Sequence, residues 1–271
     1  MKGFKKILKW VSVVVFIVSS CMLVKLLIID PKIASGAQKE IKDVYYSEST
    51  EESQPDKFAK LSVINSDIKG WIFISGTVID YPVLQSADDP EYYLNHNYKK
   101  EKSRYGSIFI NNDCQVDSDC KNIIMHGHSM KDGQMFSDLL KFSDLDFYKS
   151  NPVVEFDTPE EKGNYKIISV FKTNTLPEHG KIFNYLISKF GTKNQFKNYV
   201  EEVRKRSLLD IPVDINEDDK LITLSTCSYE FKDFRTVVVA RKVRDGETRL
   251  VDTENANYAS NPLMPDCWYR K

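Results

Sequence analysis

The 271-residue sequence lacks a surplus of positive charge over most of its length. Residues 1–30 hold five lysines and one aspartate, a net charge of +4, whereas the remainder holds 33 basic and 38 acidic residues, a net charge of −5. A mildly acidic body argues against a nucleic-acid partner, because nucleic-acid-binding domains carry basic patches. Internal repeats and low-complexity segments are also absent. These absences leave an ordinary globular protein behind a basic N-terminus.

Histidine is scarce, with four residues in the chain. His126 and His128 form a His-Gly-His sequence that could be half of a metal site. The other two, His96 and His179, lie in helix or loop contexts, so a third ligand is not evident. We therefore predict no metal and no other cofactor, and a metal hydrolase that uses His126 and His128 stays an alternative.

Cysteine is scarce too, and the five residues divide by context. Cys21 lies in the apolar N-terminal segment, and Cys114 and Cys120 flank a polar loop. A disulfide between these two is permitted outside the cell but not required, so both states stay open. Cys227 ends an apolar strand and is the residue of functional interest.

The first 30 residues are predicted to form a transmembrane anchor. Residues 10–24 carry no charge, and the apolar stretch 7–29 exceeds the roughly 20 residues that span a bilayer core. The lysines before it place the N-terminus in the cytoplasm and the rest of the chain outside. The alternative is a cleaved signal peptide, with residues 34–36 as a poor cleavage site.

Three segments follow the anchor. Residues 31–57 are rich in Glu, Ser and Lys, and we expect an extracellular linker in which little can pack. Residues 58–243 form the predicted catalytic domain. Residues 244–271 form a polar C-terminal tail that carries Trp268 and has no evident role.

The pattern between residues 70 and 243 predicts about eight short strands with inserted helices. The strands are expected at 71–74, 78–83, 107–110, 122–125, 153–156, 165–171, 221–226 and 236–243. Helices are expected from near Pro55 to before Gly70, after 88–91, at 135–148, and as two stretches within 183–209 that break near Gly191. A mostly β chain of this kind favours a closed barrel or a sandwich.

A thiol, an imidazole and a guanidinium each lie at a predicted strand edge. Cys227 would supply a nucleophile, His128 would move protons, and Arg235, eight residues after the cysteine, would stabilise charge on oxygen. No aspartate is placed to orient the histidine. Taken singly, a strand-end cysteine is usually a small buried hydrophobe, and a surface arginine is usually ion-paired.

The sequence Thr-Leu-Ser-Thr-Cys at 223–227 with Arg235 downstream, and Gly127-His128 at a strand end, resemble the signature of sortases. These are membrane-anchored transpeptidases on the surface of Gram-positive bacteria. The resemblance runs from about residue 58 to residue 243. The segments that resemble the class B branch are 65–72, 80–85, 105–109 and 130–136, with the long helical insert before the cysteine strand.

The resemblance implies an eight-stranded β-barrel with a cleft at one end and an N-terminal helix. It places the family's nucleophile on Cys227, its histidine on His128, which directly follows the glycine, and its arginine on Arg235. Ser225 and Thr226 flank the nucleophile and are expected to line the substrate pocket.

Three further residues are of secondary interest. His126 is expected to be a strand residue near the site, where the family often has an aromatic or apolar residue. Arg241 and Arg244 are the fallback if Arg235 points away.

The resemblance also implies the reaction and its partners. Secreted proteins bearing a C-terminal pentapeptide sorting signal, with motifs such as Asn-Pro-x-Thr-Asn, would be cut after Thr and held as a thioester on Cys227. An amine of a peptidoglycan precursor or cross-bridge would then accept the protein, which anchors it to the cell wall. The enzyme would be a single-pass cell-membrane protein.

The alternatives are a pilin-polymerising sortase, a secreted cysteine protease, and an inactive membrane-anchored binding domain. A papain-like protease usually has its cysteine at a helix N-terminus, whereas Cys227 ends a strand. Intact Cys227, His128 and Arg235 argue against the inactive domain.

Overall fold

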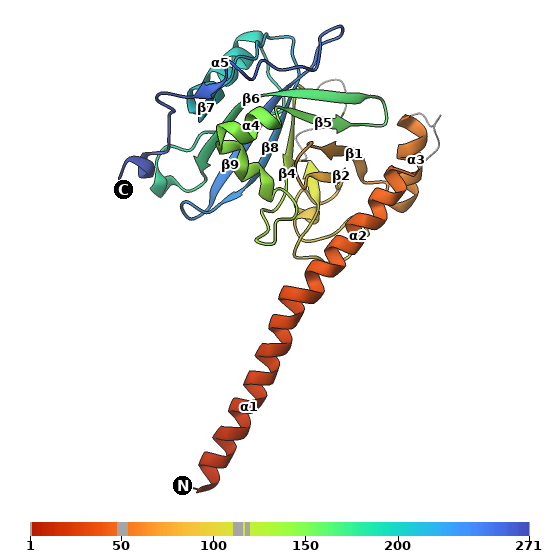
Figure 1. The fold of residues 1–271 in the computed structure, drawn as a ribbon, viewed down its shortest axis with the longest axis vertical. Coiled ribbons are helices and arrows are strands. Elements are labelled where there is room, and N and C mark those ends of the chain that lie inside the picture. Colours follow the sequence, from red (N-terminus) through yellow and green to blue (C-terminus); the bar gives the residue numbers. More distant parts are fainter. Residues whose placement is uncertain (1, 48–53, 111–115, 117–119, 271) are drawn as a thin grey trace. The chain divides into compact units, whose positions relative to one another are not determined.

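The computed structural model describes residues 2–47, 54–110, 116 and 120–270, and the chain divides into two units, residues 1–46 and 47–271. The first unit is one continuous helix, made of α1 (Lys2–Val24), a π-helical stretch (Lys25–Ile29) and α2 (Asp30–Tyr45) (Figure 1). Its apolar part has a mean hydropathy of 2.6 and is long enough to cross a membrane. The helix is therefore compatible with the predicted anchor.

The segment 31–57 is more regular than expected. α2 covers its first half as a regular helix. Pro31 directly follows the π-helical stretch Lys25–Ile29 and stands in the first turn of α2. Residues 31–45 are therefore helical, residues 48–53 lie outside the described part of the chain, and the role of this segment as a linker stays a prediction.

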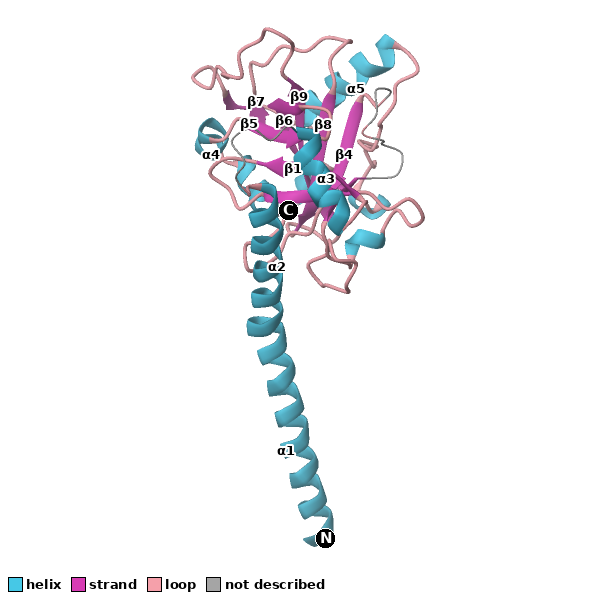
Figure 2. Ribbon diagram, turned by 90° about the vertical axis from the view of Figure 1, so that its right-hand side faces the viewer, coloured by secondary structure: helices cyan, strands magenta, loops and turns pink. Residues whose placement is uncertain are grey.

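The second unit is built on a closed barrel of eight strands (Figure 2). Around the barrel the order is β1-β2-β3-β4-β8-β9-β6-β5. The strands are β1 (Ile68–Phe73), β2 (Asp80–Leu84), β3 (Ile108–Ile110), β4 (Asn122–His126), β5 (Val153–Asp157), β6 (Lys162–Asn174), β8 (Leu221–Ser228) and β9 (Phe234–Lys242). The predicted eight-stranded barrel is confirmed, with strand ends shifted by a few residues.

Two neighbouring pairs of the barrel, β2–β3 and β4–β8, are parallel, and the other pairs are antiparallel. β8 is flanked by β4 and β9, and seven of its eight residues are buried, all except Cys227. The near-continuous run Leu-Ile-Thr-Leu fits a strand that is covered on both faces. This central position carries the end of β8 to one rim of the barrel.

Short helices and two minor strands cover the barrel. They are α3 (Gln54–Ile64), η2 (Tyr92–Leu94), η3 (Ser137–Ser143), α4 (Leu145–Ser150), η4 (Pro177–His179), α5 (Lys193–Arg206), β7 (Leu209–Asp210), β10 (Asn257–Tyr258) and η5 (Asp266–Arg270). α5 packs against β6, α3 lies against β1, and η3 contacts β6, β8 and β9.

Two of the predicted helices differ from the structure. The expected helix at 135–148 is split, because Asp144 has extended backbone angles and caps α4 by accepting a 2.9 Å hydrogen bond from the N–H of Phe147. The expected helical stretch after residue 183 is irregular. In this stretch the carbonyl of Ser188 accepts hydrogen bonds from the N–H groups of Lys121 and Asn122, at 3.0 and 3.1 Å. The backbone therefore pairs with the start of β4 and does not form helical hydrogen bonds.

The possible Cys114–Cys120 disulfide cannot be placed, since Cys114 lies outside the described residues. Cys120 is buried, and its Sγ lies 3.3 Å from the carbonyl oxygen of Asn122.

Candidate active site

Cys227 and Arg235 are direct cross-strand partners. β8 and β9 run antiparallel with Cys227 opposite Arg235 and Thr226 opposite Thr236. Residues opposite each other in such a pair have Cβ atoms about 5 Å apart and project from the same face of the sheet. The strand register therefore places the thiol beside the guanidinium, and both side chains are half-buried.

His128 is brought to the same rim by the parallel β4–β8 pair. His126 is the register partner of Ser225, and His128 and Cys227 each lie two residues further along their chains. The pairing continues past the end of β4, where Gly127 donates its N–H to Ser225 at 3.3 Å and its carbonyl accepts the Thr226 hydroxyl at 2.7 Å. Because side chains alternate with a period of two, the imidazole and the thiol arise on the same side.

The position before His128 has room only for a glycine. A Cβ atom at this position would lie 2.4 Å from Cδ1 of Ile108 and 2.9 Å from Cδ2 of Phe136. Any larger residue would push the chain away from β3 and from the segment after the histidine. The close approach thus fixes the backbone that carries His128.

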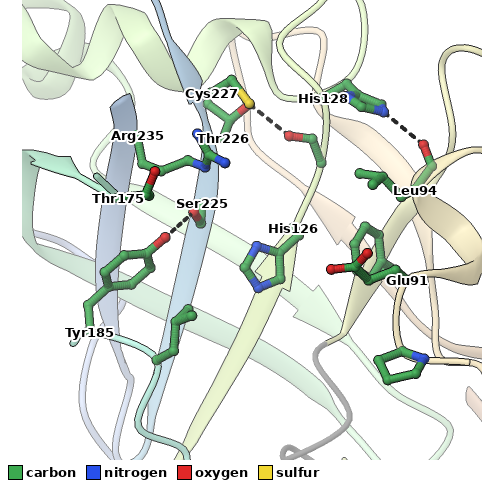
Figure 3. A pocket seen from close by; sticks show the side chains of 14 residues that line it. Glu91, Leu94, His126, His128, Thr175, Tyr185, Ser225, Thr226, Cys227 and Arg235 are labelled. Carbon is green, nitrogen blue, oxygen red and sulfur yellow. Dashed lines mark hydrogen bonds between the residues drawn. The ribbon is translucent and has the colours of Figure 1, made fainter. Parts of the chain in front are cut away.

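These residues line one pocket of about 350 Å³ (Figure 3). All five predicted site residues, Cys227, His128, Arg235, Ser225 and Thr226, are among its lining. The rest of the lining is Pro90, Glu91, Leu94, Phe109, His126, Gly127, Thr175, Tyr185 and Leu186. The sequence-predicted residues are therefore gathered in one place although they come from two distant parts of the chain.

The imidazole of His128 is directed at a backbone carbonyl. Its Nε2 lies 2.7 Å from the oxygen of Leu94 (Figure 3). An acceptor at this distance requires that Nε2 carry the proton. In this orientation Nε2 is directed at Leu94 and away from Cys227 (Figure 3).

Ser225 and Thr226 are buried and hold the pocket together. The Ser225 Oγ and the Tyr185 hydroxyl are 2.8 Å apart, and Thr226 is tied to Gly127 as described above. Burial raises the pKa of Tyr185, although the bond to Ser225 and the Arg235 charge oppose this shift. Tyr185 therefore stays a neutral hydrogen-bonding group near the thiol.

His126 is a second imidazole in the pocket, but it is not suited to proton transfer near neutral pH. Burial and, to a smaller extent, the nearby Arg235 cation together lower the pKa of His126 to about 4. Its ring lies 5.6 Å from that of Phe109. Neutral His126 forms part of the pocket wall, and the two histidines of the His-Gly-His sequence have different surroundings.

The fallback arginines lie elsewhere. Arg241 pairs with Leu221 at the opposite end of β8 and β9, where it is ion-paired to Glu247 at 2.6 Å. Arg244 is ion-paired to Asp214 at 2.6 Å and to Asp219 at 2.7 Å. Since Arg235 lines the pocket, neither is needed in its place. Within the described part of the chain, no group of three or more His, Cys, Asp and Glu side chains could hold a metal ion.

Two groups of the pocket, Tyr185 and the Leu94 carbonyl, are not indicated by the sequence. Tyr185 stands in the segment predicted to be helical, and the one local signal against a helix is Asn184, whose Oδ1 accepts the N–H of Leu186 at 3.1 Å in a turn. A backbone carbonyl such as that of Leu94 has no side-chain signature at all.

Comparison with known proteins gives a consistent result. The family model described as "Sortase domain" matches residues 72–243. Sortase B of Listeria monocytogenes is 39% identical over 179 residues, which is 66% of this chain and 70% of that protein. Sortase B of Staphylococcus aureus is 31% identical over 248 residues, which is 90% of this chain and 98% of that protein.

A solved structure agrees with these sequence matches. The Staphylococcus aureus sortase B–substrate complex superposes with a TM-score of 0.72 at 29% identity. The match covers 80% of this chain and 99% of that one.

Proposed function

Since this chain belongs to the sortase family, in its class B branch, it is a cysteine transpeptidase, and we propose that it anchors secreted proteins to the cell wall. Its substrates would carry a C-terminal sorting signal that is cut after Thr, and an amine of peptidoglycan would accept the product. The similarity to a sortase B that was solved with a substrate supports a signal-bearing protein as the donor.

The observation that carries the assignment of roles is the register of β8 with its two neighbours. It sets Arg235 opposite Cys227 and brings His128 to the same rim of the barrel. We assign the nucleophile to Cys227, proton transfer to His128, and stabilisation of the oxyanion to Arg235.

In the first half-reaction the Cys227 thiolate attacks the carbonyl carbon of the signal's Thr. A C–S bond forms, and the electron pair of the carbonyl moves to oxygen, where the Arg235 guanidinium stabilises the negative charge. The tetrahedral intermediate collapses and its C–N bond breaks. Protonated His128 donates its proton to the departing amine, which leaves a thioester on Cys227 and a neutral imidazole.

In the second half-reaction the accepting amine attacks the thioester carbonyl. The amine loses a proton to His128, the C–S bond breaks, and the Cys227 thiolate leaves. The new amide joins the secreted protein to the wall, and the enzyme regains its starting protonation. Ser225 and Thr226 would support the substrate as part of the pocket floor.

The N-terminal helix would hold this chemistry at the membrane surface. Lys2, Lys5, Lys6 and Lys9 precede the uncharged residues 10–24, which favours a cytoplasmic N-terminus and an extracellular barrel. Secreted substrates and lipid-linked wall precursors both pass this surface.

The test is mass spectrometry of the full chain in detergent micelles with peptides of the form Asn-Pro-x-Thr-Asn, where x is Gln, Lys or Ala. We expect a covalent adduct on Cys227 and a peptide cut after Thr. Cys227→Ala should form no adduct and cut no peptide. Peptide cleavage by Cys227→Ala, or a wild-type chain that is inert to the peptides and whose Cys227 resists a methanethiosulfonate reagent, would refute the proposal.

A further inference from the structure

The C-terminal tail lies beyond the part of the chain that matches the family model, which ends at residue 243. It can be followed in dark blue in Figure 1 to the C-terminus. β10 of the tail pairs with β7, and Leu263 donates its N–H to the Lys205 carbonyl at 2.8 Å. Met264 and Cys267 are 7% and 8% exposed. The tail is therefore docked on the barrel domain along its length.

The docked tail ends on a cluster of aromatic rings. The indole of Trp268 lies 5.8 Å from the ring of Phe231 and 6.3 Å from that of Phe234. Phe231 and Phe234 are 4.8 Å apart, and His179 lies 5.9 Å and 5.5 Å from them. Aromatic pairs at such distances contribute beyond the area that they bury. We call these four residues the aromatic cluster.

The aromatic cluster holds the turn that joins the proposed nucleophile to the proposed oxyanion group. Phe231 is in the middle of this turn, between β8 and β9, and Phe234 directly precedes Arg235. Asp233 in the same turn has a φ of 55°, a left-handed backbone that Asp adopts more readily than most residues other than glycine. The aromatic cluster packs on this turn, and the carbonyl of Asp233 accepts a hydrogen bond from the Thr175 hydroxyl.

A second link runs from the tail to another wall of the pocket. The chain at Gly180 passes so close to the tail that a Cβ there would lie 2.6 Å from Oδ2 of Asp266. Gly180 is joined to β6 because its carbonyl accepts a 2.9 Å hydrogen bond from Asn174 Nδ2. Thr175, the next residue, lines the pocket and donates a 2.7 Å hydrogen bond to the Asp233 carbonyl. The tail thus contacts both segments that bring Thr175 and Arg235 to the pocket.

We propose that the C-terminal tail is a positioning element of the active site, and that Trp268, by packing on Phe231 and Phe234, fixes the orientation of Arg235 toward the substrate carbonyl. The proposal rests on the function assigned above to Arg235. Trp268 touches no reacting atom and acts through the β8–β9 turn. The tail would then be required for the rate of acyl transfer and not only for stability.

The kinetic test uses Trp268→Ala and Trp268→Phe in the full chain in detergent micelles, with the peptide that the wild type cuts fastest in the panel above. Misplacement of a catalytic group by about 1 Å can cost about 100-fold, so we expect Trp268→Ala to lower kcat by about 10- to 100-fold. KM should change by less than about threefold. A fall in kcat without a change in KM indicates the loss of an interaction made only in the transition state, here that of Arg235. Trp268→Phe should recover most of the rate, because it restores an aromatic ring on the cluster.

Two controls separate positioning from folding. Leu250→Ala removes an apolar side chain of the same tail that is 75% exposed and lies outside the aromatic cluster, and it should keep the wild-type kcat. Phe231→Ala should lower kcat like Trp268→Ala, and the double variant should lose little more, since residues that act through one contact are not additive. All rates are taken well below each variant's melting temperature.

Hydrogen exchange supplies a readout that needs no substrate. In Trp268→Ala the amides of residues 228–234 should exchange about tenfold faster, while those of β4 keep their protection. Unchanged exchange at 228–234 would overturn the proposal even if the peptides prove not to be substrates. A lower melting temperature with wild-type kcat would also overturn it, because the tail would then only stabilise the fold.

Discussion

The hydroxyl of Tyr229 donates a 2.6 Å hydrogen bond to the backbone carbonyl of Ser129. Tyr229 comes two residues after Cys227, and Ser129 directly follows His128. The bond therefore ties the segment after the proposed nucleophile to the segment after the proposed proton carrier. It does so although the Tyr229 side chain is 63% exposed, where most side chains have little effect on a fold.

The hydrogen bond between Tyr229 and Ser129 predicts that removal of the Tyr229 hydroxyl alone lowers kcat. Tyr229→Phe should lower kcat by about fivefold to tenfold, because the loss of one hydrogen bond, worth about 1 kcal/mol, frees the His128 segment. The matched control is Tyr258→Phe. Tyr258 is also an exposed tyrosine, and its hydroxyl accepts a 3.2 Å hydrogen bond from the N–H of Leu145. Peptide cleavage rates are compared at equal Cys227 content. Equal rates for the two variants would show that the hydrogen bond between Tyr229 and Ser129 has no role in catalysis.

Arg235 should not be replaceable by lysine. Arg235→Lys keeps the charge but loses the planar set of donors, and we expect a fall in kcat of about 10²- to 10³-fold, as for a lost oxyanion donor. Arg249→Lys, at an exposed arginine 3.6 Å from Glu155, should leave the rate unchanged. Adduct formation followed over time distinguishes slow acylation from lost binding. A near-normal rate for Arg235→Lys would mean that a point charge is sufficient.

His126 predicts a pH dependence of stability. Its pKa is about 4 in the folded protein and 6.5 in the unfolded chain, so between these values the unfolded state binds more protons. Stability from this group is complete above pH 6.5 and falls as the pH drops toward 4. His126→Phe keeps a ring against Phe109 and removes the titration, so its melting temperature should fall less between pH 7 and pH 4.5. Parallel melting curves for the two proteins would contradict this reading.

Glu247 is predicted to be structural and not catalytic. Its two oxygens accept 2.6 and 2.7 Å hydrogen bonds from Arg241, whose side chain is 0% exposed, and the pKa of Glu247 is held well below its usual range by this bond. Glu247→Gln leaves a buried guanidinium without its main partner, which should cost about 3 kcal/mol of unfolding free energy in urea. Glu155→Gln, which loses only the exposed Arg249 pair, should cost less than about 1 kcal/mol. Peptide cleavage at 25 °C should be unchanged in both.

The sequence predicts those site residues that lie at the ends of strands. The run 221–227 ends in a cysteine, and an arginine opens the next strand, so a hairpin-like pair would set Cys227 beside Arg235. His128 was found because a glycine precedes it, and the close contact of Gly127 with Ile108 is the physical reason for that glycine. The eight short apolar runs favoured a closed barrel or a sandwich, and the resemblance to sortases implied the barrel.

The rest depends on contacts between distant segments, which periodicity does not encode. Tyr185 reaches Ser225 because the carbonyl groups of its segment pair with the start of β4, against the local preference for a helix. The carbonyl of Leu94 is an acceptor that any residue would provide. Trp268 looked isolated in a polar tail, and its partners Phe231 and Phe234 lie more than thirty residues earlier in the chain.

The parallel pairing of β4 with β8 also determines when the protein becomes active during its synthesis. Parallel neighbours need a long crossover, and here β5, β6 and α5 separate the two strands in the chain. A ribosome therefore makes His128 early and the thiol late, and β8 and β9 are the last strands that the barrel needs before it can close. Contacts this distant in sequence form slowly. A nascent chain thus carries no working thiol site while it is being made, and acquires one only when its final strands enter between β4 and β6.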